Sequence, residues 1–416
     1  MGFHAAWSMA VGGMVGGGIF SVLGVVVQLA AQWAWLSFVV AGLIALASAY
    51  SYARLAKRVD ASGGAFIFLV ELERHSFAAS LAWLLILGYV LTVSVYAFTF
   101  GHYLAHAFSL GAWFPRLCAL LVIAVLTWVN LRGVGESALV EIVTVWGKLL
   151  VLVGLAVLGL LHWAPDRLAE GVEPVGVTHA LTGAAAVFMA YEGFQLLAYD
   201  YDDMHCPRRL LPLATLSAVL SVIAVYVVVA LGAAMLVGAG TLVEQQEVAL
   251  AVAGQQALGL TGLVLVTVAA AFSTASAINA TLFSTARLMR DVAERRALPP
   301  ILSHENSRRV PDYAIIGIGA VGAALAALGS LELLVEAASL TFLFTFGTVN
   351  GIALVLCAGQ RWISLAGLIG AAAAGIVLVW RMLTDDPLVL LALAAMVLVS
   401  TLGRPLILRF FRPGTH

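Results

Sequence analysis

The chain has 416 residues, of which 62% are hydrophobic and 10% are charged, and its mean hydropathy is +1.04. Soluble domains have about 25% charged residues. This composition therefore excludes a soluble domain and indicates an integral membrane protein. A formal net charge of −1 does not indicate a nucleic-acid partner, and no such partner is expected. Cys118, Cys206 and Cys357 lie too far apart for a metal motif, and we expect neither a metal nor a cofactor.

Hydropathy predicts an all-α membrane protein, because a spanning helix needs about 20 apolar residues. The loop from Asp60 to Ser80 is too polar to span, and it predicts a short helix at the membrane surface. Twelve spanning segments are predicted, at residues 4–30, 34–56, 80–106, 114–131, 138–162, 178–202, 210–237, 259–288, 313–330, 333–357, 362–381 and 387–403.

The loop charges predict the orientation of these segments. With the N-terminus in the cytoplasm, seventeen Lys and Arg residues lie on the cytoplasmic side, and only Arg116, Arg167 and Arg381 lie outside. Cytoplasmic loops of membrane proteins carry the excess of basic residues, so we expect a cytoplasmic N-terminus. An even number of spans then returns the C-terminus to the cytoplasm. Lys148 is the one remaining basic residue, and it falls within a span.

The first span carries an unusual glycine-rich stretch at residues 11–20, with five glycines in the seven positions from Gly12 to Gly18. Glycine disfavours helix by about 1 kcal/mol relative to alanine, so the stretch predicts a discontinuous helix. Broken helices at membrane depth occur where the backbone lines a cavity, and their freed amides and carbonyls can hold a ligand. Close helix packing by small residues is the alternative interpretation of the same glycines.

The sixth span carries a second candidate break at residues 187–194, marked by Glu192. A carboxylate near the bilayer centre costs about 3 kcal/mol on insertion scales, so a functional role is the default interpretation. The two candidate breaks each begin a run of five spans. That arrangement matches an inverted repeat, with residues 1–163 and 164–358 as its halves and residues 359–416 as an addition.

Several motifs in chain order resemble those of the amino acid–polyamine–organocation transporters. They are residues 15–20 (VGGGIF), 62–66 (SGGAF), 188–194 (FMAYEGF), 202–209 (DDMHCPRR) and 286–291 (ARLMRD). The resemblance is closest to bacterial proton-coupled amino-acid permeases. It implies a leucine-transporter-like fold of five plus five helices in inverted repeat, with spans 1 and 6 discontinuous, in a bacterial inner membrane.

The resemblance also implies where a substrate binds. The amides of Gly16, Gly17 and Gly18 are expected to receive a carboxylate. The ammonium group is expected to be received by the backbone carbonyls of Met14, Val15, Phe188, Ala190 and Tyr191. Phe188 and Tyr191 are candidate gates. The predicted substrate-binding residues are Met14, Val15, Gly16, Gly17, Gly18, Ile19, Phe188, Ala190, Tyr191 and Glu192.

Lys148 is the candidate proton-coupling residue, and a structural ammonium group satisfied by backbone carbonyls or by Glu141 is the alternative interpretation. Glu141, Thr144 and Lys148 follow one another at steps of three and four, so they share one face of the fifth span. In the proton-coupled transporters that this chain resembles, a lysine on helix 5 takes the place of a coupling cation between helices 1 and 8. The resemblance therefore implies that the ammonium group reaches the carbonyls near Gly12 and Gly13 and the hydroxyl of Ser273 or Ser276.

The expected function is secondary active transport of an amino acid by alternating access, with the proton as coupling ion. An amine, polyamine or amino-acid exchanger of the same fold is the alternative, in which Glu192 would face a cationic substrate. A channel is disfavoured because no repeated acidic ring occurs. An enzyme is not expected, since His102 and His106 have no third ligand nearby in sequence. The identity of the amino acid, symport against exchange, and the oligomeric state stay open.

Overall fold

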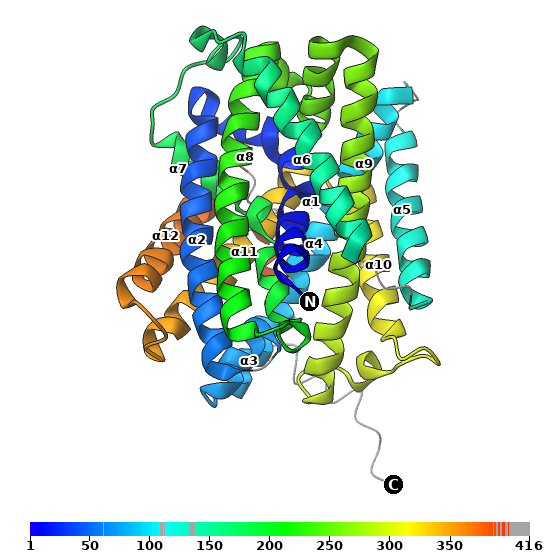
Figure 1. The fold of residues 1–416 in the computed structure, drawn as a ribbon, viewed down its shortest axis with the longest axis vertical. Helices are drawn as coiled ribbons and strands as arrows, with labels where there is room; N and C mark the ends of the chain where they lie inside the picture. The colour runs from blue at the N-terminus through cyan, green and yellow to red at the C-terminus, as the bar shows by residue number, and fades with distance from the viewer. Residues whose placement is uncertain are drawn as a thin grey trace.

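A computed structural model describes residues 1–60, 62–108, 111, 113–133 and 138–385, with a few positions between 387 and 398. Helices dominate this part of the chain and run roughly alongside one another (Figure 1). The predicted span at residues 387–403 lies largely outside the described residues, as do the predicted cytoplasmic arginines Arg404, Arg409 and Arg412. The spans and domain boundaries of that region therefore stay predictions.

The described residues form twelve α-helices. They are α1 (Phe3–Ala30), α2 (Ala34–Val59), α3 (Gly64–Glu71), α4 (His75–Phe108), α5 (Phe114–Leu131), α6 (Ala138–Leu160), α7 (His179–Ala186), α8 (Pro207–Glu244), α9 (Ala249–Glu294), α10 (Asp312–Leu328), α11 (Leu331–Val355) and α12 (Arg361–Asp385). Seven short 3-10 helices join them. They are η1 (Ala31–Trp33), η2 (Pro165–Leu168), η3 (Phe188–Tyr191), η4 (Phe194–Ala198), η5 (Tyr201–Asp203), η6 (Gln246–Val248) and η7 (Pro300–Ser303).

The helices agree with the predicted segments over most of the chain. Each of the first eleven predicted spans coincides with a helix or, for residues 178–202, with a string of short helices. The surface helix predicted between Asp60 and Ser80 is α3. Eight helical runs among the described residues are long and apolar enough to cross a membrane, and the first of them, Phe3–Val59, holds two predicted spans. The fold is therefore that of an integral membrane protein.

The glycine-rich stretch does not break the first helix, and the prediction of a discontinuous span 1 is wrong for this structure. α1 runs without interruption from Phe3 to Ala30, because its glycines are used for close packing. A methyl group on any of the three central glycines would collide with a neighbouring helix. The atoms in the way belong to Ala277 at Gly16, to the Tyr96 ring at Gly17 and to the Tyr226 hydroxyl at Gly18. Contacts with α9, α4 and α8 thus outweigh the low helix propensity of glycine.

The predicted break in the sixth span is confirmed. α7 ends at Ala186, and the chain continues through η3 to Glu192, which has an extended backbone with φ −65° and ψ 141°. Gly193 follows with φ 130°, a value that a residue with a side chain rarely adopts. The helical path is therefore interrupted where the sequence places a carboxylate among apolar residues.

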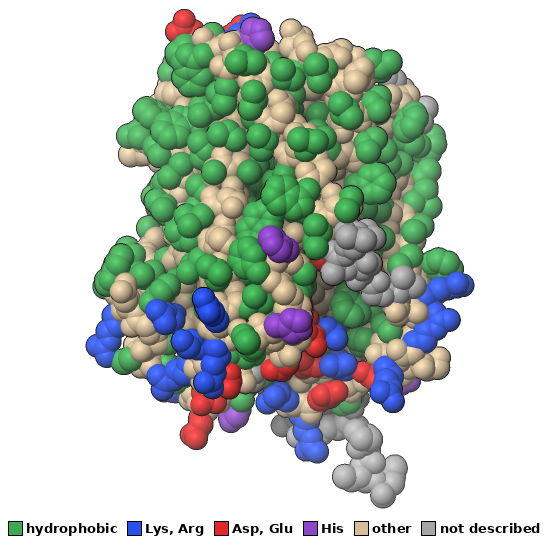
Figure 2. Space-filling model, in the orientation of Figure 1, with side chains coloured by type: hydrophobic (Ala, Val, Ile, Leu, Met, Phe, Trp, Pro, Cys, Tyr) green, Lys and Arg blue, Asp and Glu red, His purple; other side chains and the backbone are tan. Residues whose placement is uncertain are grey.

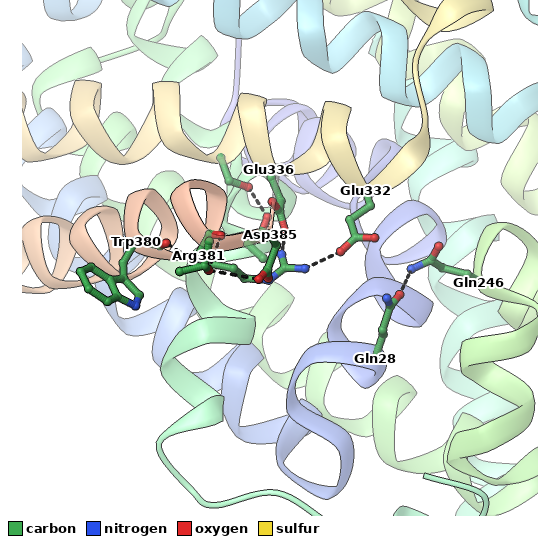
Figure 3. Close-up of polar contacts among 10 residues, drawn as sticks. Gln28, Gln246, Glu332, Glu336, Trp380, Arg381 and Asp385 are labelled. Atoms are coloured by element: carbon green, nitrogen blue, oxygen red, sulfur yellow. Dashed lines mark hydrogen bonds and ion pairs between the residues drawn. The ribbon is translucent and has the colours of Figure 1, made fainter. Parts of the chain in front are cut away.

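α1 lies inside the bundle, in contact with α8, α9, α6 and α7. Two kinked helices close one of its ends. Gly238 in α8 and Gly259 in α9 have positive φ. α8 is therefore kinked near its C-terminal end, and α9 is kinked near its N-terminal end. η6 lies between the two short legs, and Gln246 Nε2 donates to Gln28 Oε1 of α1 at 2.6 Å (Figure 3).

Charged side chains gather at one end of the molecule. Figure 2 shows Lys and Arg residues concentrated at the lower end, at the level of α3, below a wide hydrophobic surface. An apolar band of this kind is what helices present to lipid. The distribution therefore fits a protein that sits in a bilayer with its basic end at one membrane surface.

Arg381 of α12 pairs with Glu332 and Glu336 of α11 and with Asp385 one turn further along α12. We name these four side chains the Arg381 cluster (Figure 3). Arg381 donates to Glu332 Oε1 at 2.5 Å, lies 3.3 Å from Asp385 Oδ2, and forms an ion pair with Glu336. Glu336 is 2% exposed, so one of these ion pairs is buried inside the protein.

Candidate functional site

The break in the sixth span meets the continuous helix α1 in the interior, whereas the prediction had paired two breaks. The backbones of Gly13 and Gly193 are so close that a methyl group on Gly193 would lie 2.6 Å from the Gly13 carbonyl carbon. Only residues without a side chain permit this approach. The predicted substrate-binding residues from both segments, which are Met14, Val15, Gly16, Gly17, Gly18, Ile19, Phe188, Ala190, Tyr191 and Glu192, are all buried.

Tyr226 of α8 joins α1 to the broken segment. Its hydroxyl lies 2.6 Å from the Met14 carbonyl oxygen and 2.8 Å from the Ala190 carbonyl oxygen. These are two of the carbonyls that were expected to receive an ammonium group. The sequence analysis did not select Tyr226, although a tyrosine within the aliphatic run from Val222 to Val229 was a visible signal.

Other side chains satisfy the backbone of the break itself. Ser339 of α11 accepts from the Met189 amide at 3.0 Å and donates to the Ala186 carbonyl at 2.6 Å. The Gly193 amide donates to Gln195 Oε1 at 2.9 Å. Unsatisfied backbone groups are costly away from water, so these partners allow an irregular segment at this depth. Ser339 and Gln195 were also missed by the sequence analysis.

Glu192 is 1% exposed and lies among neutral polar groups. Gln195 Nε2 donates to Glu192 Oε1 at 3.0 Å and also lies 3.3 Å from the Tyr89 hydroxyl. The ring of Tyr96, which covers Gly17, lies on the same helix as Tyr89. The carboxyl group is therefore positioned by the amide of Gln195, which in turn contacts the Tyr89 hydroxyl of α4.

The candidate gates are packed in an aromatic layer. Tyr191 donates to the Phe38 carbonyl at 2.7 Å, and its ring centroid lies 5.2 Å from that of Tyr226. The Phe188 ring meets Phe346 of α11 in an edge-to-face arrangement at 5.6 Å. Edge-to-face ring pairs are favourable and fix orientation. Both predicted gates therefore contact helices outside the break, α2 and α8 for Tyr191 and α11 for Phe188.

The amides of Gly16, Gly17 and Gly18, which were expected to bind a carboxylate, lie within a continuous helix. In a continuous helix, each amide donates to the carbonyl four residues earlier, so Gly16, Gly17 and Gly18 do not present a free row of donors here. Capture of a carboxylate at these amides stays a prediction, and it would require a local opening of α1.

Lys148 of α6 reaches α1 where the prediction placed it. Its Nζ donates to the Gly12 carbonyl at 3.0 Å, and the side chain is buried, with 4% exposure of the residue. On the next turn of α1, Ser273 Oγ of α9 donates to the Val15 carbonyl at 3.0 Å. Gly13 and Ser276 are half-buried nearby in α1 and α9. The carbonyls of one stretch of α1 thus accept donors from both α6 and α9.

No group of three or more His, Cys, Asp or Glu residues is arranged to hold a metal ion within the described part of the chain. His102 Nδ1 lies 2.9 Å from the Phe98 carbonyl oxygen, and its ring stacks on the Phe98 ring. This is a local contact along one helix.

A bundle of apolar helices around an irregular, polar-lined segment defines a polytopic membrane protein with a buried polar centre. The family model for amino acid permeases matches residues 1–402. The chain therefore belongs to the amino acid permease family and is a transporter rather than an enzyme. A small-molecule substrate follows from that membership.

Individual relatives support this assignment. The chain is 30% identical to the inner membrane transport protein YbaT of Escherichia coli, over 86% of this chain and 83% of the relative. It is 27% identical to the serine/threonine exchanger SteT of Bacillus subtilis, over 76% and 73% of the two chains. The crystal structure of an Eremococcus coleocola manganese transporter mutant shares the fold, with a TM-score of 0.63, 13% identity, and coverage of 99% of this chain and 95% of that one.

Proposed function

We propose that this permease moves an amino acid across a bacterial inner membrane by alternating access, driven by symport with protons. The observation that carries the proposal is the bond from Lys148 to the Gly12 carbonyl. A protonated amine holds α1 against α6 there, while Ser273 holds the same stretch against α9. Loss of the proton would weaken the first of these contacts. Proton binding and the position of α1 are thereby coupled.

The substrate site lies between α1 and the break. Its backbone carbonyls suit an ammonium group, and the amides of Gly16 to Gly18 suit a carboxylate once α1 opens. A closed conformation of the proposed cycle would bury this site, and the bridge from Tyr226 to the Met14 and Ala190 carbonyls supports that part of the proposal. The excess of basic residues on one side supports cytoplasmic termini at both ends of the chain.

Uptake of radiolabelled amino acids into proteoliposomes tests the proposal. We expect saturable uptake that does not need sodium and rises with an inward proton gradient. Lys148→Ala should abolish the response to the gradient while substrate binding survives. The matched control is Gly147→Ala, one residue away, where a methyl group meets no atom within 4 Å. Strict dependence of wild-type uptake on sodium would overturn the coupling mechanism.

Exchange of amino acids or amines is the second candidate. One relative, the serine/threonine exchanger SteT, favours exchange by its name. The vacuolar cationic amino acid transporter 2 of Arabidopsis thaliana, 27% identical over 84% of this chain and 58% of the relative, favours a cationic substrate by its name. Buried Glu192 would face the substrate cation in that case. Exchange would be supported if uptake required an amino acid or amine inside the liposome and did not require a proton gradient.

A further inference from the structure

A pocket of about 260 Å³ opens between α2 and α8, away from the transport site. α2 and α8 lie side by side on the face seen in Figure 2, and Lys and Arg side chains gather at their lower ends. None of the residues that line the pocket is acidic. They are Tyr50, Ala53, Arg54 and Lys57 of α2 and Arg208, Arg209, Pro212 and Leu216 of α8.

The charges of the pocket favour an anion. Arg54 and Lys57 are three residues apart on α2 and therefore share one side of the helix. Arg208 is already matched by Asp60, with Nη2 to Oδ2 at 2.6 Å, so Arg54, Lys57 and Arg209 supply the excess positive charge.

The start of α8 adds to this field. α8 begins at Pro207, next to Arg208 and Arg209, and is 38 residues long. The first turn of a helix carries a partial positive charge and favours phosphate groups. The basic side chains of the pocket and the backbone at the start of α8 therefore both attract a phosphate group.

The other wall of the pocket is apolar and continues along α8. Pro212 and Leu216 line the pocket, and Leu213 and Leu220 lie beyond them with 56% and 54% exposure. An inorganic anion gains nothing by contact with an apolar surface, whereas a lipid acyl chain is stabilised by the burial of its CH₂ groups there. The occupant that satisfies both walls has a phosphate group and hydrocarbon chains.

The geometry points to a specific binding site for an anionic phospholipid in this pocket. The lipid phosphate lies among Arg54, Lys57 and Arg209, and its acyl chains follow the exposed leucines of α8. Basic pockets between spanning helices at the cytoplasmic surface are suited to lipid head groups. The site is separate from Lys148 and Glu192, so it does not depend on the proposed transport mechanism.

Native mass spectrometry of the full chain tests the site, with dioleoyl phosphatidylglycerol and dioleoyl phosphatidylcholine as competing probes. Wild-type protein is expected to retain phosphatidylglycerol preferentially. The triple variant Arg54→Gln, Lys57→Gln and Arg209→Gln should bind phosphatidylglycerol on the order of 100-fold more weakly. Each of the three basic residues contributes to the affinity for an anionic lipid, and all three contributions are lost. Asp60→Asn should strengthen retention, because it releases the charge of Arg208.

The matched control replaces three exposed basic residues at the same end of the molecule, Arg295, Arg296 and Arg309, with Gln. It removes the same charge and should retain the lipid as the wild type does. If the control variant lost phosphatidylglycerol to the same extent, the effect would come from net charge alone, and the proposed site would be wrong. Stabilisation by inorganic phosphate equal to that by phosphatidylglycerol would assign the pocket to a free anion instead. The double variant Arg54→Lys and Arg209→Lys should keep binding the lipid, because lysine as well as arginine neutralises a phosphate.

Discussion

Glu192 and Glu336 are both buried carboxyl groups, but the protein surrounds them in opposite ways. Glu336 is 2% exposed and lies against Arg381, within a cluster that joins α11 to α12. Glu192 is 1% exposed, and its hydrogen-bond donor is the neutral amide of Gln195, within a broken segment. The first carboxylate has a fixed counter-charge. The Glu192 carboxyl group has a neutral partner that can hydrogen-bond to it whether or not the carboxyl group is protonated.

The difference separates a structural charge from a functional one. An ion pair in the interior is tolerated when its charges are matched, and its loss leaves one charge without compensation. A buried carboxyl group among amides and hydroxyls can change its protonation or its partner at lower cost, because no ion is left behind. We therefore expect the Arg381 cluster to govern stability and the surroundings of Glu192 to govern transport.

Arg381→Met is the change with the largest expected effect. It leaves Glu336 buried without a cation, which should lower the free energy of unfolding by about 3–5 kcal/mol. The measurement is the melting temperature in detergent. Adding Glu336→Gln to this variant should restore part of the loss. Arg361→Met, at the exposed beginning of the same helix, is the control and should shift stability by no more than about 0.5 kcal/mol.

If Arg381→Met melted like the wild type, the cluster would not be structural and the comparison would fail. If the double variant were no more stable than Arg381→Met, the cost would arise from lost packing of the arginine side chain rather than from the uncompensated carboxylate of Glu336.

Gln195→Leu should have a smaller effect. It removes the donor to Glu192 and the acceptor of the Gly193 amide at once. A buried polar group without a partner costs about 1–3 kcal/mol, so stability should fall by that amount. Gln255→Leu, at an exposed position of α9, is the control. An unchanged melting temperature for Gln195→Leu would show that the break does not depend on this side chain.

Much of the fold could be predicted from the sequence, because spanning helices are set by local hydropathy. The predicted 114–131 segment has the bounds of α5, and α1 differs from its predicted span by one residue. The break near Glu192 was predictable for a similar reason, since a carboxyl group in an apolar run is a local signal.

The packing of α1 could not be predicted in the same way. Whether the run at Gly16 to Gly18 breaks a helix or packs it depends on which side chains press against it, and these come from three other helices. Tyr226 and Ser339 were missed for the same reason, because each contacts the break from a distant part of the chain. The contact of Lys148 with Gly12 was placed by resemblance to a family, not by local pattern.

Glu192→Gln should change stability less than Gln195→Leu, by about 1 kcal/mol or less. A glutamine oxygen can accept the same bond from Gln195, so no buried donor is left unsatisfied. The comparison is sharpened by measuring uptake alongside the melting temperature. Retained uptake of neutral amino acids supports a positioning role for the carboxyl group. Selective loss of amine uptake would support the exchanger with a cationic substrate.

The smallest effect is expected at Asp60, which forms an exposed ion pair with Arg208 and extends the comparison to the surface. Arg208 donates to both carboxylate oxygens, and Tyr201 donates to Oδ1 at 2.9 Å. The Arg208 bonds, followed by the Tyr201 bond, lower the pKa of Asp60 below its usual value. Asp60→Asn keeps a residue that tolerates the φ of 57° found there.

The pH dependence of this variant has a definite sign. Because the pKa of Asp60 is lower in the folded protein, its contribution to stability is present above the ordinary aspartate pKa of about 4. It is lost as the pH falls through the lowered value. The melting temperature of the wild type should therefore exceed that of Asp60→Asn slightly at pH 7 in detergent, and the difference should vanish in acid. Salt should shrink the difference as well, since exposed pairs are screened, whereas the buried pair of Arg381 with Glu336 should respond less. A difference that grew on acidification would contradict the assignment of Asp60 as the ionised partner.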